Sequence, residues 1–315
     1  MHYAIRHLTR FRYSAPVTES MMEIRMQPRS DAGQRCVSFR LQTVPRALVS
    51  SHRDHNGNIV HHFDIPPRHT QITVTAEAVV EVSAPPAPDA ATGWDALGVG
   101  LPLDVLDALV PSHYARPTPL LATLTGAVWP VRPATPLQAL RGLNHAMARH
   151  FAYAPQSTHV DSPIDDALRS GRGVCQDFAH IFIAAARSIG IPCRYVSGYL
   201  FHRLEDHDRS AADATHAWAE AWLPGVGWHG FDPTNDIEAG VRHIRVAVGR
   251  DYADVPPTRG VFRGGADETL DVVVRVQPTD VPVTPEPAEA VAPPWLEPVV
   301  AADDLAALQQ QQQQQ

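Results

Sequence analysis

The chain is poor in cysteine, has no long apolar run and has no cluster of basic residues. Its 315 residues include three cysteines, Cys36, Cys175 and Cys193. Three thiols cannot all pair and are too few for a disulfide framework, so we expect reduced thiols. No apolar run reaches the roughly 18 residues that span a bilayer, and the opening stretch MHYAIRHLTRFRYS is charged where a signal peptide is apolar. We therefore expect a cytoplasmic protein with no membrane partner.

The charge of the chain also disfavours nucleic acid as a partner. The formal net charge is −8, and no group of basic residues is dense enough to neutralise a row of phosphates. What is present is typical of a globular protein: 44% of the residues are hydrophobic and 19% are charged. At about 100–200 residues per domain, the length favours two domains.

Residues 1–84 are predicted to form an antiparallel β domain. The segments YAIRHLTRFRY, VSFRLQTV and QITVTAEAVVEV alternate apolar and polar residues, which is typical of strands with one buried face. Asn56 and Gly57 tolerate positive φ and predict a hairpin turn within SHRDHNGNIVHHFDI. Proline, alanine and glycine dominate the beginning of residues 85–100, which we interpret as a linker.

The second domain is predicted over residues 101–277. Apolar residues recur at helical spacing in PLDVLDALV, PLLATLTGAV and TPLQALRGLNHAMARHF, and Thr135 is the expected N-cap of the last of these helices. The run from Val174 to Ile189 predicts a further helix, ended by Gly190 and followed by strand-like segments. A helix followed by antiparallel strands is an α+β layout. Residues 278–315 are rich in proline and end in seven glutamines, which predicts a disordered tail.

Cys175 directly precedes the apolar part of this helix pattern, so we expect it at the helix N-terminus, where the dipole stabilises a thiolate. The same position also suits a small core residue. A catalytic cysteine needs an imidazole to accept its proton and a further group to orient that imidazole. His216 in THAWAEAWL and Asp232 in WHGFDPTND lie on strands joined by a short turn, so they can share a hydrogen bond. Taken singly, His216 also suits a buried core position and Asp232 the first residue of a turn.

Three separated segments carry a family resemblance: GRGVCQDFAHIFIAAARSIGIPCRYVSGYL, THAWAEAWLPGVGWHGFDPTND and HIRVAVGRDYADVPPTRGVFRGG. Together, over about residues 140–276, they resemble the bacterial transglutaminase-like superfamily, whose core is papain-like. Residues 2–82 are similar to the β-rich N-terminal region of the same bacterial proteins. The resemblance implies a nucleophile at Cys175, a general base at His216 and an orienting acid at Asp232, all of them intact. It also implies that the helix bearing the cysteine packs on an antiparallel sheet.

The reaction implied by the resemblance is acyl transfer through a thioester. The Cys175 thiolate, formed with the help of His216, would attack an amide carbonyl, and water or an amine would resolve the thioester. The resulting oxyanion needs hydrogen-bond donors. The Cys175 backbone N–H is one expected donor, and Gln176 and Tyr153 are candidates for the second.

We expect hydrolysis of peptide or protein amides, by a cysteine protease or amidase, because water is always available whereas transfer needs a site that excludes it. A protein transglutaminase and a non-catalytic interaction module are the alternatives. No metal or cofactor is expected, because no close ligand pair of the C-x-x-C type is present and Cys193 suits a core position. The histidine-rich SHRDHNGNIVHH suits a solvated hairpin better than a metal site. These residues do not determine the oligomeric state.

Overall fold

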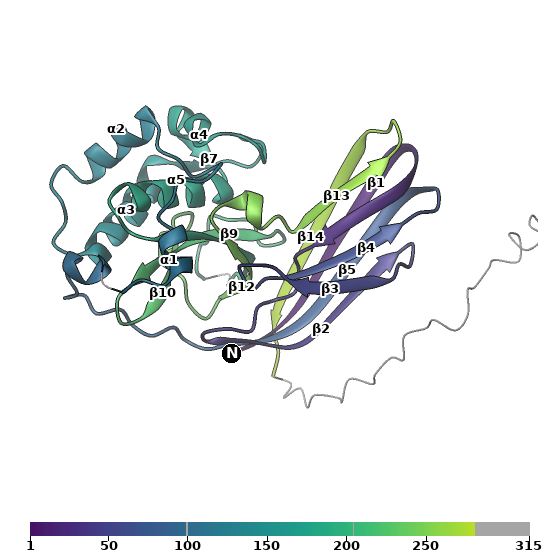
Figure 1. Ribbon diagram of the computed structural model, residues 1–315, viewed down its shortest axis with the longest axis horizontal. Coiled ribbons are helices and arrows are strands. Elements are labelled where there is room, and N and C mark those ends of the chain that lie inside the picture. The colour runs from purple at the N-terminus through teal and green to yellow at the C-terminus, as the bar shows by residue number, and fades with distance from the viewer. Residues whose placement is uncertain (99, 204, 281–315) are drawn as a thin grey trace, which may run out of the picture. The chain divides into compact units, whose positions relative to one another are not determined.

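The computed structural model describes residues 1–98, 100–203 and 205–280 (Figure 1). The tail predicted at residues 278–315 lies outside the described residues from position 281 onward. The predicted α+β fold is confirmed: a folded antiparallel sheet is combined with a domain in which helices pack on a second antiparallel sheet.

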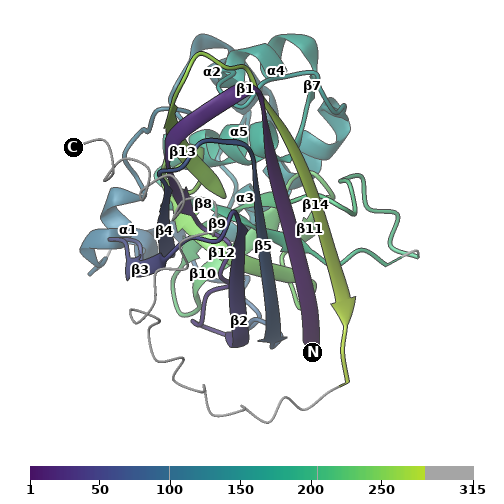
Figure 2. The same ribbon diagram turned by 90° about the vertical axis from the view of Figure 1, so that its right-hand side faces the viewer.

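The N-terminal domain is built around one long strand, β1. Its seven strands are β1 (His2–Ile24), β2 (Gln34–Val44), β3 (Val49–Arg53), β4 (Ile59–Ile65), β5 (His69–Val82), β13 (Thr258–Arg263) and β14 (Glu268–Pro278). The first half of β1 lies between β5 and β14, which run beside it in Figure 2, and the second half lies between β4 and β13. Phe11 and Ile72 from one half of the sheet meet Ile24 and Phe63 from the other in a shared apolar core. The predicted hairpin joins β3 to β4, and Gly57 in its turn has a positive φ of 75°.

The last two strands of this sheet come from residues 258–278, most of which the sequence analysis assigns to the second domain. Val273 pairs with Leu8 and Thr258 pairs with Ile24, so β13 and β14 complete the N-terminal sheet. The valine-rich sequence of β14 predicts a strand, whereas the proline and glycine residues in and around β13 predict a loop. The sequence does not predict the partner strand, because strand pairing joins residues that are far apart in the chain. The chain thus leaves the N-terminal domain after β5 and returns to it after the second domain.

The second domain contains the helices and a five-stranded antiparallel sheet in the order β11-β10-β9-β8-β12. Its helices are η1 (Trp94–Gly98), α1 (Leu103–Asp107), α2 (Pro119–Val128), α3 (Pro136–His150), α4 (Ile164–Ser170), α5 (Cys175–Ser188) and η2 (Tyr252–Asp254). Its strands are β6 (Ala152–Tyr153), β7 (Arg172–Gly173), β8 (Cys193–Leu200), β9 (His216–Leu223), β10 (Gly227–Asp232), β11 (Ile237–Glu238) and β12 (His243–Gly249). Thr135 caps α3 as predicted, because its hydroxyl accepts the Gln138 N–H at 3.3 Å. The short elements α4, β6 and β7 were not predicted.

Helix α5 is the centre of this domain. Its apolar residues, among them Phe178 and Phe182, are buried against the sheet. On the sheet side the contacts are made by small residues of β9, including Ala217 and Ala219, which let the helix approach the strands closely. The sheet and the N-terminal end of α5 therefore hold a fixed relation to each other, which positions the residues discussed below.

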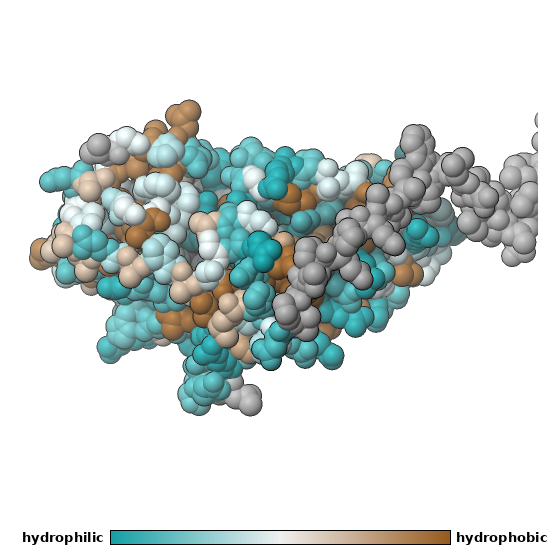
Figure 3. Space-filling model, turned by 90° about the horizontal axis from the view of Figure 1, so that it is seen from below, coloured by the Kyte–Doolittle hydropathy of each residue, from teal (hydrophilic) through white to brown (hydrophobic). Residues whose placement is uncertain are grey.

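The surface of the described residues shows no broad apolar face in the view of Figure 3, where hydrophobic residues lie in small groups between hydrophilic ones. The most exposed large apolar side chains, Leu48, Leu103 and Val131, come from separate segments. Scattered apolar residues of this kind are usual on protein surfaces. Within residues 1–98, 100–203 and 205–280, no helix is both long enough and apolar enough to cross a membrane.

Candidate active site

Cys175 is the first residue of α5, where the sequence analysis places it. Asp177 caps this end of the helix: its Oδ2 accepts the Val174 N–H at 2.8 Å and the Thr158 hydroxyl at 2.6 Å. Gly173 makes room for the cap, since a Cβ there would lie 2.9 Å from the same oxygen. Cys175 is half-buried and packs against the core. The unpaired N–H groups of a first helical turn favour negative charge on such a thiol.

His216 begins β9 and Asp232 ends β10, on neighbouring antiparallel strands. The structure brings them together: His216 Nε2 lies 2.8 Å from Asp232 Oδ2, and both side chains are buried. Burial alone would lower the pKa of His216. The charge and hydrogen bond of Asp232, with a smaller contribution from Cys175, outweigh burial and raise that pKa to about 10.

The two ring nitrogens of His216 therefore have different surroundings. Nε2 donates its proton to Asp232, whereas Nδ1 is buried and has no hydrogen-bond partner among the described residues. Cys175 lies close enough to His216 to raise its pKa, and Nε2 is already occupied. Nδ1 is thus the nitrogen that is available to the thiol, with Asp232 fixing the tautomer from the opposite side of the ring.

Asp232 is held by more groups than the sequence analysis anticipated. Its Oδ2 also accepts hydrogen bonds from Asn235 Nδ2 at 2.8 Å and from His243 Nε2 at 3.2 Å, and its Oδ1 accepts the Thr234 N–H at 3.0 Å. Burial would raise the pKa of Asp232, but the positive charge of His216 and these hydrogen bonds hold it well below its usual range. The carboxylate is therefore ionised at neutral pH although it is fully buried.

His243 and Asn235 were missed by the sequence analysis. Asn235 follows Asp232 in the FDPTND segment and links it to the preceding loop, because its Nδ2 donates to Ser210 Oγ at 3.1 Å and its Oδ1 accepts the Arg209 N–H at 2.7 Å. His243 opens the third of the family-like segments. A histidine at the start of an otherwise apolar strand was the signal that could have identified it.

The two candidate oxyanion donors differ in their placement. Gln176 Nε2 donates to the Val160 carbonyl oxygen at 2.8 Å, which ties this side chain to the loop before α4. Tyr153 is half-buried near Cys175: burial raises its pKa, Cys175 raises it further, and the Ala211 backbone opposes both. Of the two side chains, Tyr153 is the one whose hydroxyl interacts electrostatically with the Cys175 thiol.

The other cysteines have different environments. Burial raises the pKa of Cys36 to about 11 and that of Cys193 to about 12. Cys193 lies in the core, as its sequence context indicates. Both thiols are therefore almost entirely protonated at neutral pH.

His216, Asp232 and His243 have ligand atoms within 4.8 Å of one another, which is close enough for a metal ion. Hydrogen bonds already explain this cluster. Both imidazoles direct Nε2 at one carboxylate oxygen, and Gly240 N–H occupies Nδ1 of His243. The chemistry of the site therefore needs no metal in this position.

Comparison with known proteins identifies two family regions in the chain. Residues 3–81 match the bacterial transglutaminase-like N-terminal region, and residues 130–233 match the transglutaminase-like superfamily. The second match contains Cys175, His216 and Asp232.

Relatives cover nearly the whole chain. A protein of Mycobacterium leprae is 36% identical over 273 residues, which are 86% of this chain and 96% of that protein. A protein of Mycobacterium tuberculosis is 37% identical over 301 residues, covering 88% and 92% respectively. The crystal structure of "a Putative Cysteine Protease from Cytophaga hutchinsonii" shares the fold, with a TM-score of 0.67 and 20% identity over 89% of this chain and 92% of that one. The chain therefore belongs to the transglutaminase-like superfamily and carries its bacterial N-terminal region.

Proposed function

We propose that this protein is a thiol-dependent amide hydrolase, a cysteine protease or amidase, that acts through Cys175, His216 and Asp232. One observation carries the proposal: the buried hydrogen bond between His216 Nε2 and Asp232 leaves Nδ1 of His216 available to the thiol at the N-terminus of α5. A core histidine without a catalytic role would be expected to satisfy both ring nitrogens.

The first half of the reaction forms a thioester. His216 Nδ1 takes the thiol proton, and the thiolate attacks the amide carbonyl carbon to form the C–S bond and an oxyanion. The Cys175 N–H is a preorganised donor for this oxyanion, and a donor of this kind contributes about 3 kcal/mol to transition-state stabilisation. When the oxyanion collapses, the C–N bond breaks and the His216 imidazolium transfers its proton to the leaving amine.

The second half releases the acid. His216 Nδ1 removes a proton from water, which attacks the thioester carbonyl, and the C–S bond breaks to regenerate the thiolate beside the imidazolium. An amine in place of water would make the protein a transglutaminase. The chain contains no lysine, so none of its own side chains can supply the acceptor amine.

The test is the pH dependence of iodoacetamide alkylation, followed cysteine by cysteine with peptide mass spectrometry. We expect Cys175 to react near pH 6 much faster than Cys36 and Cys193, whose raised pKa values make them internal references. His216→Ala should abolish this low-pH phase, because the thiolate then lacks its imidazolium partner.

The same samples should be assayed with casein and with a dansyl amine. Peptide release that is lost in Cys175→Ala would support the hydrolase, whereas incorporation of the amine would identify a transglutaminase. If Cys175 instead reacts in a single phase near the free-thiol range in wild type and in His216→Ala alike, the site is not activated. The interaction-module alternative would then replace the enzyme.

A further inference from the structure

His243 shares a carboxylate oxygen with the catalytic histidine. It is the first residue of β12 and is buried, and its Nε2 lies 3.2 Å from the same Asp232 oxygen that His216 binds. Gly240 N–H donates to His243 Nδ1 at 3.2 Å, so Nδ1 is an acceptor and Nε2 carries the ring proton. His243 thus donates to Asp232 as a neutral imidazole.

The charged groups around His243 are Asp232 from β10, His216 from β9 and Arg242, which precedes it in the chain. Burial lowers the pKa of His243, and the hydrogen bond to Asp232 opposes this only in part, while the positive charges of His216 and Arg242 lower it further. Trp218 packs edge-on against the ring at 5.1 Å between centroids. These influences together favour the neutral form of His243.

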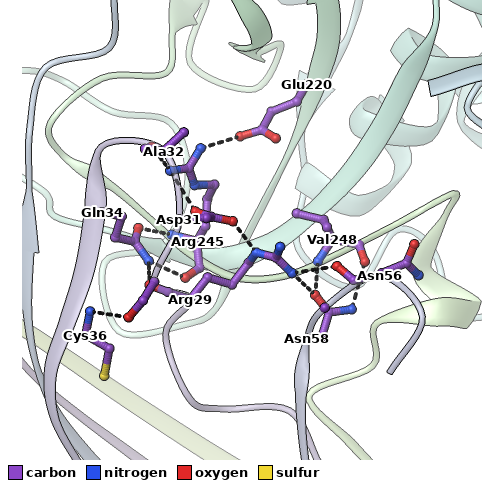
Figure 4. Close-up of polar contacts among 12 residues, drawn as sticks. Arg29, Asp31, Ala32, Gln34, Cys36, Asn56, Asn58, Glu220, Arg245 and Val248 are labelled. Atoms are coloured by element: carbon purple, nitrogen blue, oxygen red, sulfur yellow. Dashed lines mark hydrogen bonds and ion pairs between the residues drawn. The ribbon is translucent and has the colours of Figure 1, made fainter. Parts of the chain in front are cut away.

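The strand that carries His243 is an edge strand of its sheet, and side-chain amides of the N-terminal domain cover its free edge (Figure 4). Gln34 Oε1 accepts the Arg245 N–H and Gln34 Nε2 donates to the Arg245 carbonyl, both at 2.8 Å. Asn58 repeats the arrangement with Val248, again with two bonds of 2.8 Å. Each amide thus pairs with β12 as a neighbouring strand would.

Further contacts fix the position of the strand. Arg245 of β12 lies 3.0 Å from Asp31, which follows the first strand of the N-terminal domain, and Figure 4 shows this ion pair beside the Gln34 amide. On the face of β12, Ile244 and Val246 pack with Tyr3 and other apolar residues of the N-terminal sheet. The N-terminal domain therefore holds both the edge and the apolar face of the strand that begins with His243.

We propose, on the basis of the function proposed above, that His243 is a positioning residue for the catalytic carboxylate and that the N-terminal domain holds the strand that presents it. By donating to Oδ2, His243 fixes the carboxylate and disperses its charge. Without this donor, Asp232 attracts the His216 proton more strongly. The imidazolium then keeps its proton to higher pH and transfers it less readily to the leaving amine.

The first test compares His243→Leu with His243→Gln, because the Gln Nε2 can supply a neutral donor near the position of the lost ring nitrogen. We expect His243→Leu to lower kcat for casein hydrolysis about tenfold or more and to move the alkaline limb of kcat/KM upward by about half a pH unit or more. His243→Gln should restore most of both. Equal losses in the two variants with an unmoved limb would show a purely structural role and overturn the assignment.

The second test separates positioning by the N-terminal domain from binding of substrate by it. Gln34→Ala should lower kcat and move the alkaline limb in the same direction as His243→Leu, with KM unchanged. Gln71→Ala is the matched control, because Gln71 is an exposed amide on β5 of the same domain. A change in KM alone, or no change, would overturn the role of the domain.

Alkylation of Cys175 keeps the two proposals distinguishable. A wild-type protein without the low-pH phase would refute the hydrolase itself. A wild-type protein with that phase, together with His243→Leu that matches it in rate and pH profile, would refute only the positioning role.

Discussion

Asp232→Asn changes one oxygen to an NH2 group, yet we expect it to disable the site. Oδ2 accepts hydrogens from His216, His243 and Asn235, and Oδ1 accepts the Thr234 N–H. If the Asn oxygen keeps the backbone contact, its NH2 faces three donors. His216 can relieve the conflict by moving its proton to Nδ1, but Nδ1 is then no longer able to accept the thiol proton.

The expected losses follow from these contacts. Removing one partner of a buried ion pair costs about 3–5 kcal/mol, and a hydrogen bond to a charged group contributes about 1.5–3 kcal/mol. We therefore expect the free energy of unfolding to fall by about 4 kcal/mol and Tm by about 10 °C. Loss of the correct histidine tautomer in a triad lowers kcat about 10⁴-fold, and we expect a similar loss here.

The stability difference between wild type and Asp232→Asn should depend on pH in a defined way. The pKa of His216 is raised to about 10, so its contribution is complete below about pH 6.5 and is lost as pH rises through 10. The pKa of Asp232 is lowered, so its contribution is complete above about pH 4 and is lost as pH falls further. The difference should therefore be largest between about pH 4 and 6.5.

Urea denaturation followed by circular dichroism across this pH range, with casein hydrolysis on the same preparations, measures both effects. Asn235→Asp is a useful companion variant, because it places a second carboxylate beside Asp232 and should also lower stability. An Asp232→Asn protein with activity within about tenfold of wild type, and with a pH-independent stability difference, would refute the ion pair as the basis of the site.

Three further changes test the scaffold, each by urea denaturation at pH 7. Gly198→Ala should lower the free energy of unfolding by at least about 3 kcal/mol, because the added Cβ would overlap the Ile244 carbonyl oxygen. Gly142→Ala is the control, because a Cβ at this position in α3 meets open space and should be neutral or stabilising. Equal effects of the two changes would contradict the close approach of β8 and β12. Asp177→Asn should cost about 1–2 kcal/mol through the weakened cap of α5, and an unchanged stability would argue against that cap. Arg187→Met should cost about 3 kcal/mol because buried backbone carbonyls lose their donor, and a neutral effect would show that other groups satisfy them.

Much of the site was predictable because its residues belong to local patterns. The apolar helix pattern placed Cys175 at the start of α5, and the structure confirms that position. The strand patterns of β9 and β10, with a short turn between them, made a contact between His216 and Asp232 plausible, and the structure shows it. Neighbouring elements with short connections are brought together by the chain itself.

The features that were missed depend on pairing between distant segments. His243 reaches Asp232 only because β12 pairs with β8 in the sheet order β10-β9-β8-β12. The free edge of β12 is held by Gln34, which lies more than 200 residues earlier in the chain. Likewise, β14 joins β1 although about 260 residues separate them. Alternation along a strand predicts which face is buried but does not predict the partner.

The amino-acid sequence by itself therefore determined the fold class, the elements that carry the thiol, imidazole and carboxylate, and their order, because these depend on local periodicity, capping and turn residues. Only the tertiary structure decided which strand closes the N-terminal sheet, which nitrogen of His216 is left for Cys175, and which second histidine binds Asp232. These depend on hydrogen bonds between groups that are distant in the chain, and their geometry exists only once the two sheets have packed together.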